Sequence, residues 1–293
     1  MNLIITGATG FLGKELIKFL KKKKIYKIKF AFRSKKKNIL ESDQIIVNKN
    51  NIIKSKIKLK KFNPDFVIHL ATYYTSKSDL ELQNKILDAN LKFGSNLLEL
   101  LKNKKIKLFI YTNTYTIYNS KKIYSPKNFY SVTKFLFQKI LEFYSNIYNF
   151  KVVNLLLTDT YGPTDKRKKF LNYLFHSYKN NSKLNASHGF QKINLVHVKD
   201  VIECIYKIIQ YQKKLKRWNN FSIYSKETLN LRKLNKIFEK LYNKDQLVNF
   251  NFFKYRKNED LNFFPKFKKF YKWRQKIDLI AGIKGIKDSK NLK

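Results

Sequence analysis

The chain has very little cysteine, with Cys204 as the single one in 293 residues. One thiol cannot form a disulfide framework within the chain or supply a cysteine-based metal cluster, and no metal site is expected. Cys204 lies in an apolar pattern of helical spacing and is interpreted as a small core residue. No uninterrupted apolar run reaches the roughly 18 residues that a membrane span needs. The chain starts with a strand-like segment and lacks a leader pattern, so we expect a reduced, cytoplasmic protein without membrane insertion.

Arginine is also scarce, although the formal net charge is +43. Only six of the 63 basic residues are arginine, whereas lysines occur along nearly the whole chain together with abundant Asn, Ile, Phe and Tyr. Arginine reads phosphates and bases better than lysine, so selection for a nucleic-acid partner would favour it. AT-rich codons encode all five abundant residue types, so a genomic base bias explains the composition. No nucleic-acid partner is expected, and attraction of acidic substrates is a by-product.

Glycines are few, eight in all, yet Gly7, Gly10 and Gly13 stand close together. The run LIITGATGFLG at 3–13 predicts a short buried strand, a glycine turn and then a helix. A side chain at such a turn would keep the backbone away from a dinucleotide's pyrophosphate, and the helix start offers free N–H groups and a positive dipole end. The spacing differs from the usual Gly-x-Gly-x-x-Gly pattern, and an ordinary strand-to-helix turn is the alternative. Dinucleotide binding by these glycines is the favoured prediction.

Acidic residues are missing just after the second expected strand, at 28–32. A nicotinamide-binding fold selects its cofactor there. An acid binds the ribose 2′-hydroxyl of NAD, whereas Arg with small or basic neighbours accommodates the 2′-phosphate of NADP. Arg33 and Ser34 follow this strand, and the next acid is Glu41. The sequence therefore favours NADP, with NAD as the alternative.

Strands alternate with helices along most of the chain. We expect further strands at 44–47, 66–71, 107–112, 152–157 and 193–198, helices at 80–101, 129–148, 171–178 and 201–210, and a loop at 180–191. This alternation predicts an α/β fold, a Rossmann-type doubly wound parallel sheet. Residues 1–160, with 190–212 returning to them, are expected to form the dinucleotide-binding domain. Residues 161–189 and 213–293 are expected to form a smaller substrate-binding lobe over the carboxyl ends of the strands.

Two side chains on the expected helix at 129–148 suit proton transfer. Tyr130 and Lys134 are four residues apart and share one helix face, and an ammonium group beside a phenol lowers the phenol's pKa. Thr114, at the end of the preceding strand, can offer a hydroxyl to the same substrate oxygen. Because Tyr and Lys are so common here, a solvated helix face is the alternative for any single pair, but the position after Thr114 favours this one. His69, inside an apolar run, is interpreted as a buried structural residue.

Several segments together resemble the extended short-chain dehydrogenase/reductases, the NAD-dependent epimerase/dehydratase family. The motifs are GATGFLG (7–13), PDFVIHLA (64–71), TYTIY (114–118), YSVTK (130–134), TYGP (160–163) and NLVHVKDV (194–201). The resemblance implies that Tyr130 exchanges a proton with the substrate, that Lys134 activates it and binds the nicotinamide ribose, and that Thr114 hydrogen-bonds the substrate oxygen. It also implies further cofactor contacts at Phe11, Leu12, Leu70, Ala71 and Thr72.

Two departures from the family narrow the expected reaction. Its sugar 4,6-dehydratases carry Asp-Glu directly after the catalytic Thr, whereas this chain has Tyr115 and Thr116, which disfavours dehydration. The family's usual Arg-Asp pair is replaced by Ile193 and Asn194. The segments at 158–170 and 187–201 most resemble reductases that make deoxysugars such as abequose and paratose. The substrate contacts that this implies are Thr114, Tyr115, Asp159, Arg167 and Lys169, and Arg167 or Lys169 is expected to contact the substrate's diphosphate.

We therefore expect an NADPH-dependent 4-ketoreductase of a nucleotide-linked 4-keto-6-deoxysugar, acting in surface polysaccharide or O-antigen synthesis and present as a homodimer. One alternative is a nucleotide-sugar epimerase with tightly bound NAD. Another is a cofactor-binding protein of this fold without activity, which the presence of Thr114, Tyr130 and Lys134 disfavours.

Overall fold

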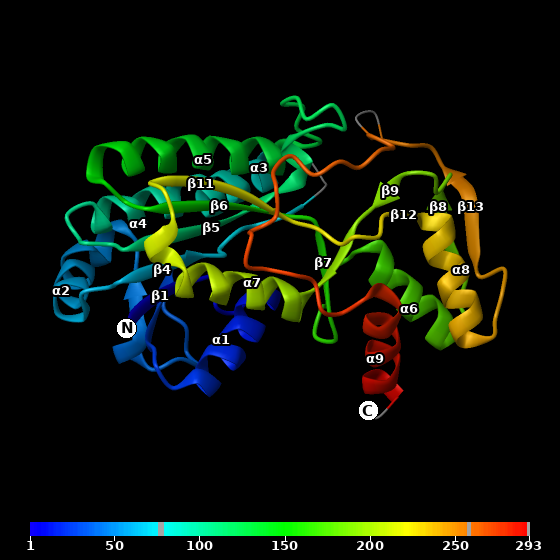
Figure 1. Cartoon of the computed structure of the whole chain (residues 1–293), viewed down its shortest axis with the longest axis horizontal. Helices are drawn as coiled ribbons and strands as arrows, with labels where there is room; N and C mark the ends of the chain where they lie inside the picture. The colour runs from blue at the N-terminus through cyan, green and yellow to red at the C-terminus, as the bar shows by residue number, and fades with distance from the viewer. Residues whose placement is uncertain (76–78, 257–258, 292–293) are drawn as a thin grey trace.

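A parallel sheet of seven strands forms the centre of the computed structural model, which describes residues 1–75, 79–256 and 259–291. The strands are β1 (Asn2–Thr6), β2 (Lys27–Phe32), β3 (Gln44–Ile46), β4 (Phe66–His69), β5 (Leu108–Thr114), β6 (Val152–Leu157) and β11 (Trp218–Ile223). They lie in the order β11-β6-β5-β4-β1-β2-β3, with parallel pairing throughout (Figure 1). The expected Rossmann-type fold is confirmed.

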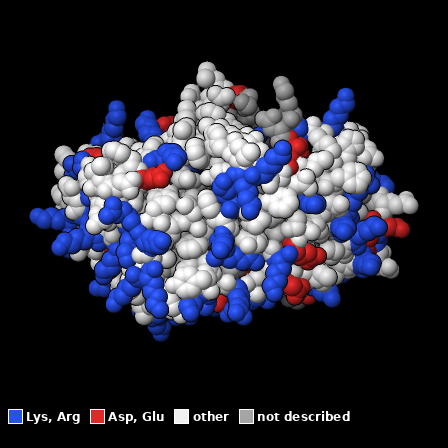
Figure 2. Space-filling model, turned by 45° about the horizontal axis from the view of Figure 1, so that its top comes forward, with Lys and Arg blue, Asp and Glu red and all other residues white. Residues whose placement is uncertain are grey.

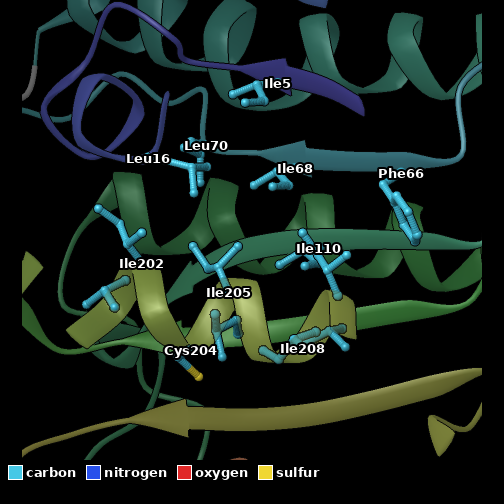
Figure 3. Close-up of a cluster of buried hydrophobic side chains, with 14 of the residues drawn as sticks. Ile5, Leu16, Phe66, Ile68, Leu70, Ile110, Ile202, Cys204, Ile205 and Ile208 are labelled. Atoms are coloured by element: carbon cyan, nitrogen blue, oxygen red, sulfur yellow. The ribbon is translucent and has the colours of Figure 1, made fainter. Parts of the chain in front are cut away.

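Helices cover both faces of this sheet, because successive residues of each strand point to opposite sides and both sides are apolar. On one face, α1 (Phe11–Lys23) and α7 (Val198–Gln210) pack against side chains such as Ile5 and Ile68 (Figure 3). Cys204 of α7 is fully buried there, as expected. On the opposite face, α2 (Ile52–Phe62), α4 (Phe93–Leu101) and α5 (Phe129–Tyr148) pack against residues such as Ile4 and Val67.

A second apolar core lies beyond the ends of β6 and β11. Leu174, Phe238 and Ile283 belong to this cluster of apolar side chains and are fully buried in it. The helices of this lobe are α6 (Phe170–Asn180), α8 (Leu231–Tyr242) and α9 (Leu279–Asn291). Its short strands pair as β7 (Asp159–Tyr161) with β10 (Leu195–His197), β9 (Lys192–Ile193) with β12 (Leu229–Asn230), and β8 (Leu184–Ser187) with β13 (Val248–Phe253). Figure 1 shows this lobe to the right of the central sheet.

Some expected elements differ from the structure for local reasons. The strand at 66–71 ends at His69, since the Ala71 N–H is bonded to the Thr6 hydroxyl. The strand at 193–198 is interrupted at Asn194, whose side-chain amide bonds to three neighbouring residues of the segment 225–228 and to Thr158. The helix at 80–101 consists of α3 (Leu80–Leu87), a π-helical segment (Asp88–Lys92) and α4.

Two corrections concern the second lobe. Residues 180–191 include β8 and are therefore not only a loop. Residues 218–223, assigned to the lobe from sequence, form β11, the edge strand of the central sheet. Helix α7 leads into this strand, which pairs in parallel with β6. Residues 257–258 and 292–293 of the expected lobe lie outside the described residues.

The described part of the chain holds no helix that is both long and apolar enough to cross a bilayer. Lysine and arginine side chains are spread over the face shown in Figure 2, in keeping with the net charge of +43.

Candidate active site

The glycine turn lies at the carboxyl end of β1, where the strand order reverses between β1 and β4. Gly7 has a φ of +69°, and a Cβ there would lie 2.7 Å from the Ala71 backbone nitrogen. A Cβ on Gly13 would collide with the Gly7 carbonyl oxygen. Gly10 is the N-cap of α1 and provides no side-chain cap, so the first N–H groups of the helix keep their capacity to bind a ligand. A phosphate-bearing ligand fits this turn.

The other segments predicted to bind the cofactor border the same turn. Phe11 and Leu12 begin α1 directly after it. Residues 70–72 follow β4, the neighbour of β1, and the bond from the Ala71 N–H to the Thr6 hydroxyl (3.0 Å) ties them to the end of β1. The Thr72 hydroxyl donates to Asn90 Oδ1 at 3.0 Å, which fixes this segment to the helix that covers it.

Arg33 and Ser34 follow β2, the other neighbour of β1. The Arg33 side chain is exposed, and its carbonyl accepts a hydrogen bond from Asn48 Nδ2 at 3.0 Å. Ser34 lines a hollow whose wall also carries Lys35, Lys54 and Lys58, together with Glu41, which pairs with Lys35 at 2.6 Å. Basic groups therefore surround the place where the end of β2 meets a dinucleotide in this fold class.

His69 is a structural residue, as interpreted from sequence. It is 1% exposed, its Nδ1 lies 3.1 Å from Thr6 Oγ1, and its ring stacks on Phe137. Burial, with a smaller effect of the Lys134 ammonium, lowers its pKa to about 3. The imidazole is therefore neutral and takes no part in proton transfer near neutral pH.

Lys134 is almost fully buried on the inner face of α5, at 3% exposure. Its Nζ donates a hydrogen bond of 2.6 Å to the Thr112 carbonyl of β5 and lies 4.2 Å from the centre of the Tyr111 ring. Burial lowers its pKa to about 7. In this conformation the Lys134 ammonium is hydrogen-bonded to the backbone of β5.

Tyr130 lies one turn earlier on α5, and its ring packs edge-on against Tyr74 at 5.0 Å. Burial raises the pKa of its phenol, and the Thr72 side chain and the charges of Lys169 and Arg167 lower it only in part. The expected lowering by Lys134 is therefore wrong for this structure. The physical reason is that desolvation dominates and that the Lys134 ammonium is bonded to a backbone carbonyl.

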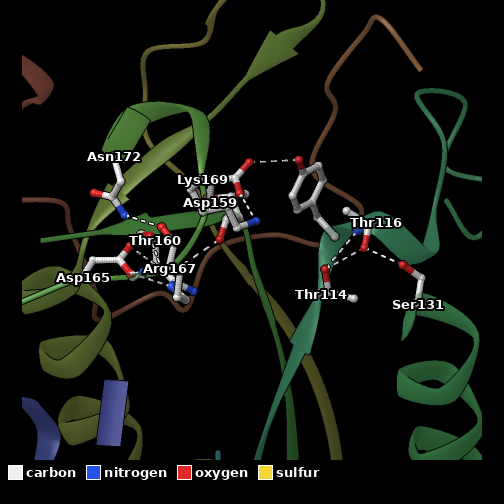
Figure 4. Close-up of polar contacts among 11 residues, drawn as sticks. Thr114, Thr116, Ser131, Asp159, Thr160, Asp165, Arg167, Lys169 and Asn172 are labelled. Atoms are coloured by element: carbon white, nitrogen blue, oxygen red, sulfur yellow. Dashed lines mark hydrogen bonds and ion pairs between the residues drawn. The ribbon is translucent and has the colours of Figure 1, made fainter. Parts of the chain in front are cut away.

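Thr114 ends β5, and its hydroxyl belongs to a hydrogen-bonded chain. Thr114 Oγ1 lies 2.8 Å from Thr116 Oγ1, which lies 2.7 Å from Ser131 Oγ on α5 (Figure 4). This chain links the end of β5 to the first turn of the helix that carries Tyr130 and Lys134.

Three predicted substrate residues, Tyr115, Asp159 and Lys169, meet at the half-buried Asp159 carboxylate. Asp159 of β7 accepts hydrogen bonds from the Tyr115 hydroxyl at 3.1 Å and from Lys169 Nζ at 3.0 Å. Burial by itself would raise the pKa of Asp159, but the Lys169 ammonium and these hydrogen bonds outweigh it and the pKa is lowered. Lys169 Nζ also lies 5.0 Å from the centre of the Tyr74 ring. The cluster is thus connected through Tyr74 to Tyr130.

Arg167 lies between this cluster and the glycine turn. Its Nε and Nη2 each donate to the Asp165 carboxylate at 2.8 Å, and Nη2 also donates to the Thr160 carbonyl (Figure 4). Its guanidinium carbon lies 4.8 Å from the centre of the Phe11 ring. These bonds use Nε and Nη2, so a contact of Arg167 with a substrate diphosphate would be made by Nη1.

Sequence reasoning missed several residues of this site. Asp165 has a signal, since an acid two positions before an arginine can orient it. Tyr74, Thr116 and Ser131 have none, because Tyr is common in this chain and a hydroxyl residue next to a motif is not distinctive. Within the described residues, no three His, Cys, Asp or Glu side chains are grouped so that they could hold a metal ion.

The pattern of the NAD dependent epimerase/dehydratase family matches residues 3–223, which is most of the chain. The chain belongs to this family. It is accordingly an NAD(P)-dependent enzyme of the extended short-chain dehydrogenase/reductase type. The CDP-abequose synthase of Yersinia pseudotuberculosis is 30% identical to it over 212 residues, covering 71% of this chain and 73% of that protein. The dTDP-4-dehydro-6-deoxyglucose reductase of Escherichia coli is 23% identical over 269 residues, covering 85% and 84%.

Solved structures of other family members share the fold. The UDP-glucuronic acid 4-epimerase of Bacillus cereus, in complex with UDP-glucuronic acid and NAD, superposes with a TM-score of 0.83 at 20% identity and full coverage of both chains. The UDP-glucose 4-epimerase of Thermotoga maritima, with UDP-glucose, gives a TM-score of 0.81 at 18% identity, again with full coverage. The glycine turn of this epimerase/dehydratase family member, with Gly7 and Gly13 in places where a Cβ does not fit, suits the dinucleotide that the family uses.

Proposed function

We propose that this enzyme is an NADPH-dependent reductase of a nucleotide-linked 4-keto-6-deoxysugar, acting in the synthesis of surface polysaccharide or O-antigen sugars. The similarity to CDP-abequose synthases and to a dTDP-4-dehydro-6-deoxyglucose reductase supports this reaction class. Thr114, Tyr130 and Lys134 are its proposed catalytic residues. They come from β5 and α5, which are packed together at the carboxyl edge of the sheet.

The observation that carries the choice of reaction is the pair that follows Thr114. Water elimination needs an acid and a base beside the sugar ring, and the two positions carry Tyr115 and Thr116. Both hydroxyls are bonded within the protein, to Asp159 and to Ser131. Burial raises the pKa of Tyr115 well above its usual value, so this side chain is a poor acid and base near neutral pH. Dehydration is therefore disfavoured relative to simple carbonyl reduction.

The proposed residues divide the reduction among them. Bound NADPH would supply the hydride for the C4 carbonyl carbon. The neutral Tyr130 phenol, which burial keeps protonated, gives its proton to the C4 oxygen as charge develops there. Lys134, one turn along α5, can stabilise the phenolate that this transfer leaves if its ammonium turns from the Thr112 carbonyl toward Tyr130. Thr114 is proposed to hydrogen-bond the same C4 oxygen, as the acceptor from the alcohol or, with its proton turned toward the ligand, as the donor to the ketone.

The substrate is proposed to meet the cluster around Asp159. This cluster is held together by the hydrogen bonds of Asp159 to Tyr115 and Lys169. Lys169 contacts the Tyr74 ring, and the Tyr74 ring packs against Tyr130. Arg167 is the proposed contact to the substrate diphosphate through Nη1, and Asp165 holds it in place.

The reaction can be tested by following NADPH absorbance with a panel of CDP- and dTDP-linked 4-keto-6-deoxyhexoses. We expect NADPH to be consumed with at least one of them, and no consumption of NADPH or NADH with the whole panel would contradict the proposal. The variant Tyr130→Phe should lower the rate about 10²- to 10⁴-fold by removing the proton donor. Tyr173→Phe makes the same change at an exposed position of α6 and should leave the rate unchanged.

NADP is the proposed cofactor, and NAD is the alternative. The exposed Arg33 side chain and the lysines around Ser34 favour a 2′-phosphate. Replacing Arg33 by Asp should shift the ratio of dissociation constants toward NADH by about tenfold or more, the worth of a charged hydrogen bond. Arg217→Asp, the same charge change just before β11, is the control. Fluorescence titration of NADPH and NADH measures both ratios, and equal ratios in the two variants would contradict the assignment.

An epimerase is the second candidate, favoured by the NAD-bound epimerases that share the fold. Such an enzyme returns the hydride to its substrate. It would copurify with tightly bound NAD and interconvert C4 epimers without net consumption of cofactor. A protein of this fold without activity is the third candidate, and it would be favoured if Tyr130→Phe altered no measurable reaction.

A homodimer is proposed through the outer face of α5. Leu136, Phe143 and Ile147 lie at helical spacing on this helix and are 44%, 58% and 62% exposed. An exposed apolar helix face of this kind is typical of a protein interface. Light scattering should give about twice the monomer mass, and Phe143→Lys should shift it to the monomer if the proposal is right.

A further inference from the structure

Four side chains, the proposed catalytic Thr114 and three others, form one continuous chain of hydrogen bonds. It runs from Thr114 through Thr116 and Ser131 to Asn128, with oxygen–oxygen distances of 2.8, 2.7 and 3.0 Å. Thr114 is 8% and Ser131 0% exposed, so water has little access to either hydroxyl. Figure 4 shows dashed lines from Thr114 to Thr116 and from Thr116 to Ser131, between the end of β5 and the start of α5.

The last member of this chain can only accept. Asn128 is the N-cap of α5, and its Oδ1 accepts the Ser131 backbone N–H at 3.0 Å. A backbone N–H needs an acceptor, so this atom is the amide oxygen and not the nitrogen. The Ser131 hydroxyl, which lies 3.0 Å from the same oxygen, must therefore donate to it.

The direction of the other bonds follows because each hydroxyl has a single proton. The proton of Ser131 is given to Asn128, so in the next bond Thr116 is the donor and Ser131 the acceptor. The proton of Thr116 is then in use, and Thr114 must donate to Thr116. In addition, the Thr116 N–H approaches Thr114 Oγ1 at 3.3 Å. Thr114 consequently has a lone pair to offer a ligand and no free proton.

We propose that Thr116, Ser131 and Asn128 are positioning residues that hold Thr114 as a hydrogen-bond acceptor, so that the site binds the alcohol form of its substrate more tightly than the ketone form. This rests on the proposed function only in that the reacting group is a carbonyl and alcohol pair beside Thr114. An alcohol can donate to the Thr114 oxygen. A carbonyl oxygen can only accept and finds no proton there.

The chain can reverse at a small and countable cost. If Ser131 donates to Thr116, Thr116 to Thr114 and Thr114 to a bound ketone, only the bond from the Ser131 hydroxyl to Asn128 is lost. The N-cap bond to the Ser131 N–H is kept. One neutral hydrogen bond corresponds to about a fivefold change in an equilibrium constant. Asn128 therefore biases the site about fivefold toward the alcohol.

The first test is independent of any substrate. Neutron diffraction from deuterated crystals of the full chain locates the deuterium atoms on the three hydroxyls. We expect the deuterium of Thr114 to lie toward Thr116 and that of Thr116 toward Ser131. A Thr114 deuterium directed away from Thr116 would overturn the proposal, whatever the enzyme's substrate is.

The second test measures the consequence with Ser131→Ala, which removes one hydroxyl and keeps the backbone N–H that Asn128 caps. Calorimetry on cofactor-free protein gives the dissociation constants of CDP-4-keto-6-deoxyglucose and of the alcohols formed from it at C4. We expect the ketone-to-alcohol ratio of dissociation constants to fall about fivefold, because Thr116 can then turn its proton to Thr114. Ser145→Ala is the matched control, since Ser145 is also fully buried on α5 and its hydroxyl bonds only to the Phe150 carbonyl among the contacts described.

If Ser131 has only a structural role, Ser131→Ala should weaken the binding of both ligands equally. An unchanged ratio of the ketone and alcohol dissociation constants would therefore overturn the proposed effect on binding. If neither ligand binds to the wild-type enzyme, the proposed substrate class fails, and the deuterium positions still decide the direction of the chain.

Discussion

The buried Lys134 predicts an unusual dependence of stability on pH. In the unfolded chain this lysine has its ordinary pKa of 10.5, whereas in the folded protein burial lowers it to about 7. Between these two values the unfolded state binds more protons than the folded state, so the free energy of unfolding rises with pH. Below the lower value, the full penalty for burying the charge is roughly 5 kcal/mol.

The variant Lys134→Met isolates this effect. The substitution also removes the hydrogen bond to the Thr112 carbonyl and alters packing, but these changes are independent of pH. From about pH 6 to about pH 9, the stability of the wild type relative to the variant should increase by about 2.5 kcal/mol. Urea unfolding followed by the fluorescence of the buried Trp273 measures both proteins at each pH.

Lys139→Met on the same helix provides the control, since the Lys139 side chain is 56% exposed and pairs with Glu142. If the wild type and Lys134→Met keep the same separation in unfolding free energy across this pH range, then Lys134 is not desolvated as the structure indicates. The reasoning about its charge, including its proposed role next to Tyr130, would then be refuted.

Four further substitutions test the packing and the buried hydrogen bonds of the fold. Gly7→Ala should destabilise the protein by about 1–3 kcal/mol and weaken NADPH binding, because its φ is +69° and a Cβ would meet the Ala71 backbone; thermal unfolding and fluorescence titration check this. Gly285→Ala in α9, where a Cβ meets nothing within 4 Å, should instead stabilise by about 0.5–1 kcal/mol, and a loss there would contradict the comparison. Gly94→Ala should cost about 1–3 kcal/mol in urea unfolding, since its Cβ would collide with the Phe137 ring between α4 and α5. Asp200→Asn should cost about 1–3 kcal/mol, because its two carboxylate oxygens accept the N–H groups of residues 276 and 277 and an amide can accept only one of them; a stability equal to wild type would contradict this.

The sequence alone determined the fold class and named residues that the structure brings together in the proposed site. The glycine turn at 7–13 and the helix at 129–148 were predictable because each depends on contacts within a few residues: a strand followed by glycines, and apolar residues at helical spacing. The helix has the predicted bounds, and the spacing of Tyr130 and Lys134 places them one turn apart on it. The parallel arrangement of the sheet was also accessible, because strands that alternate with helices are joined by crossovers.

Only the tertiary structure decided which groups these side chains contact. β11 became part of the central sheet by pairing with β6, more than 60 residues away along the chain. The Lys134 ammonium is hydrogen-bonded to a carbonyl of β5, and the Asp159 carboxylate accepts hydrogen bonds from Tyr115 and Lys169. Periodicity cannot predict such contacts, because they depend on how distant segments pack and on which buried polar groups need a partner. The sequence thus specified the elements and the reactive residue types, and packing set their protonation, direction and partners.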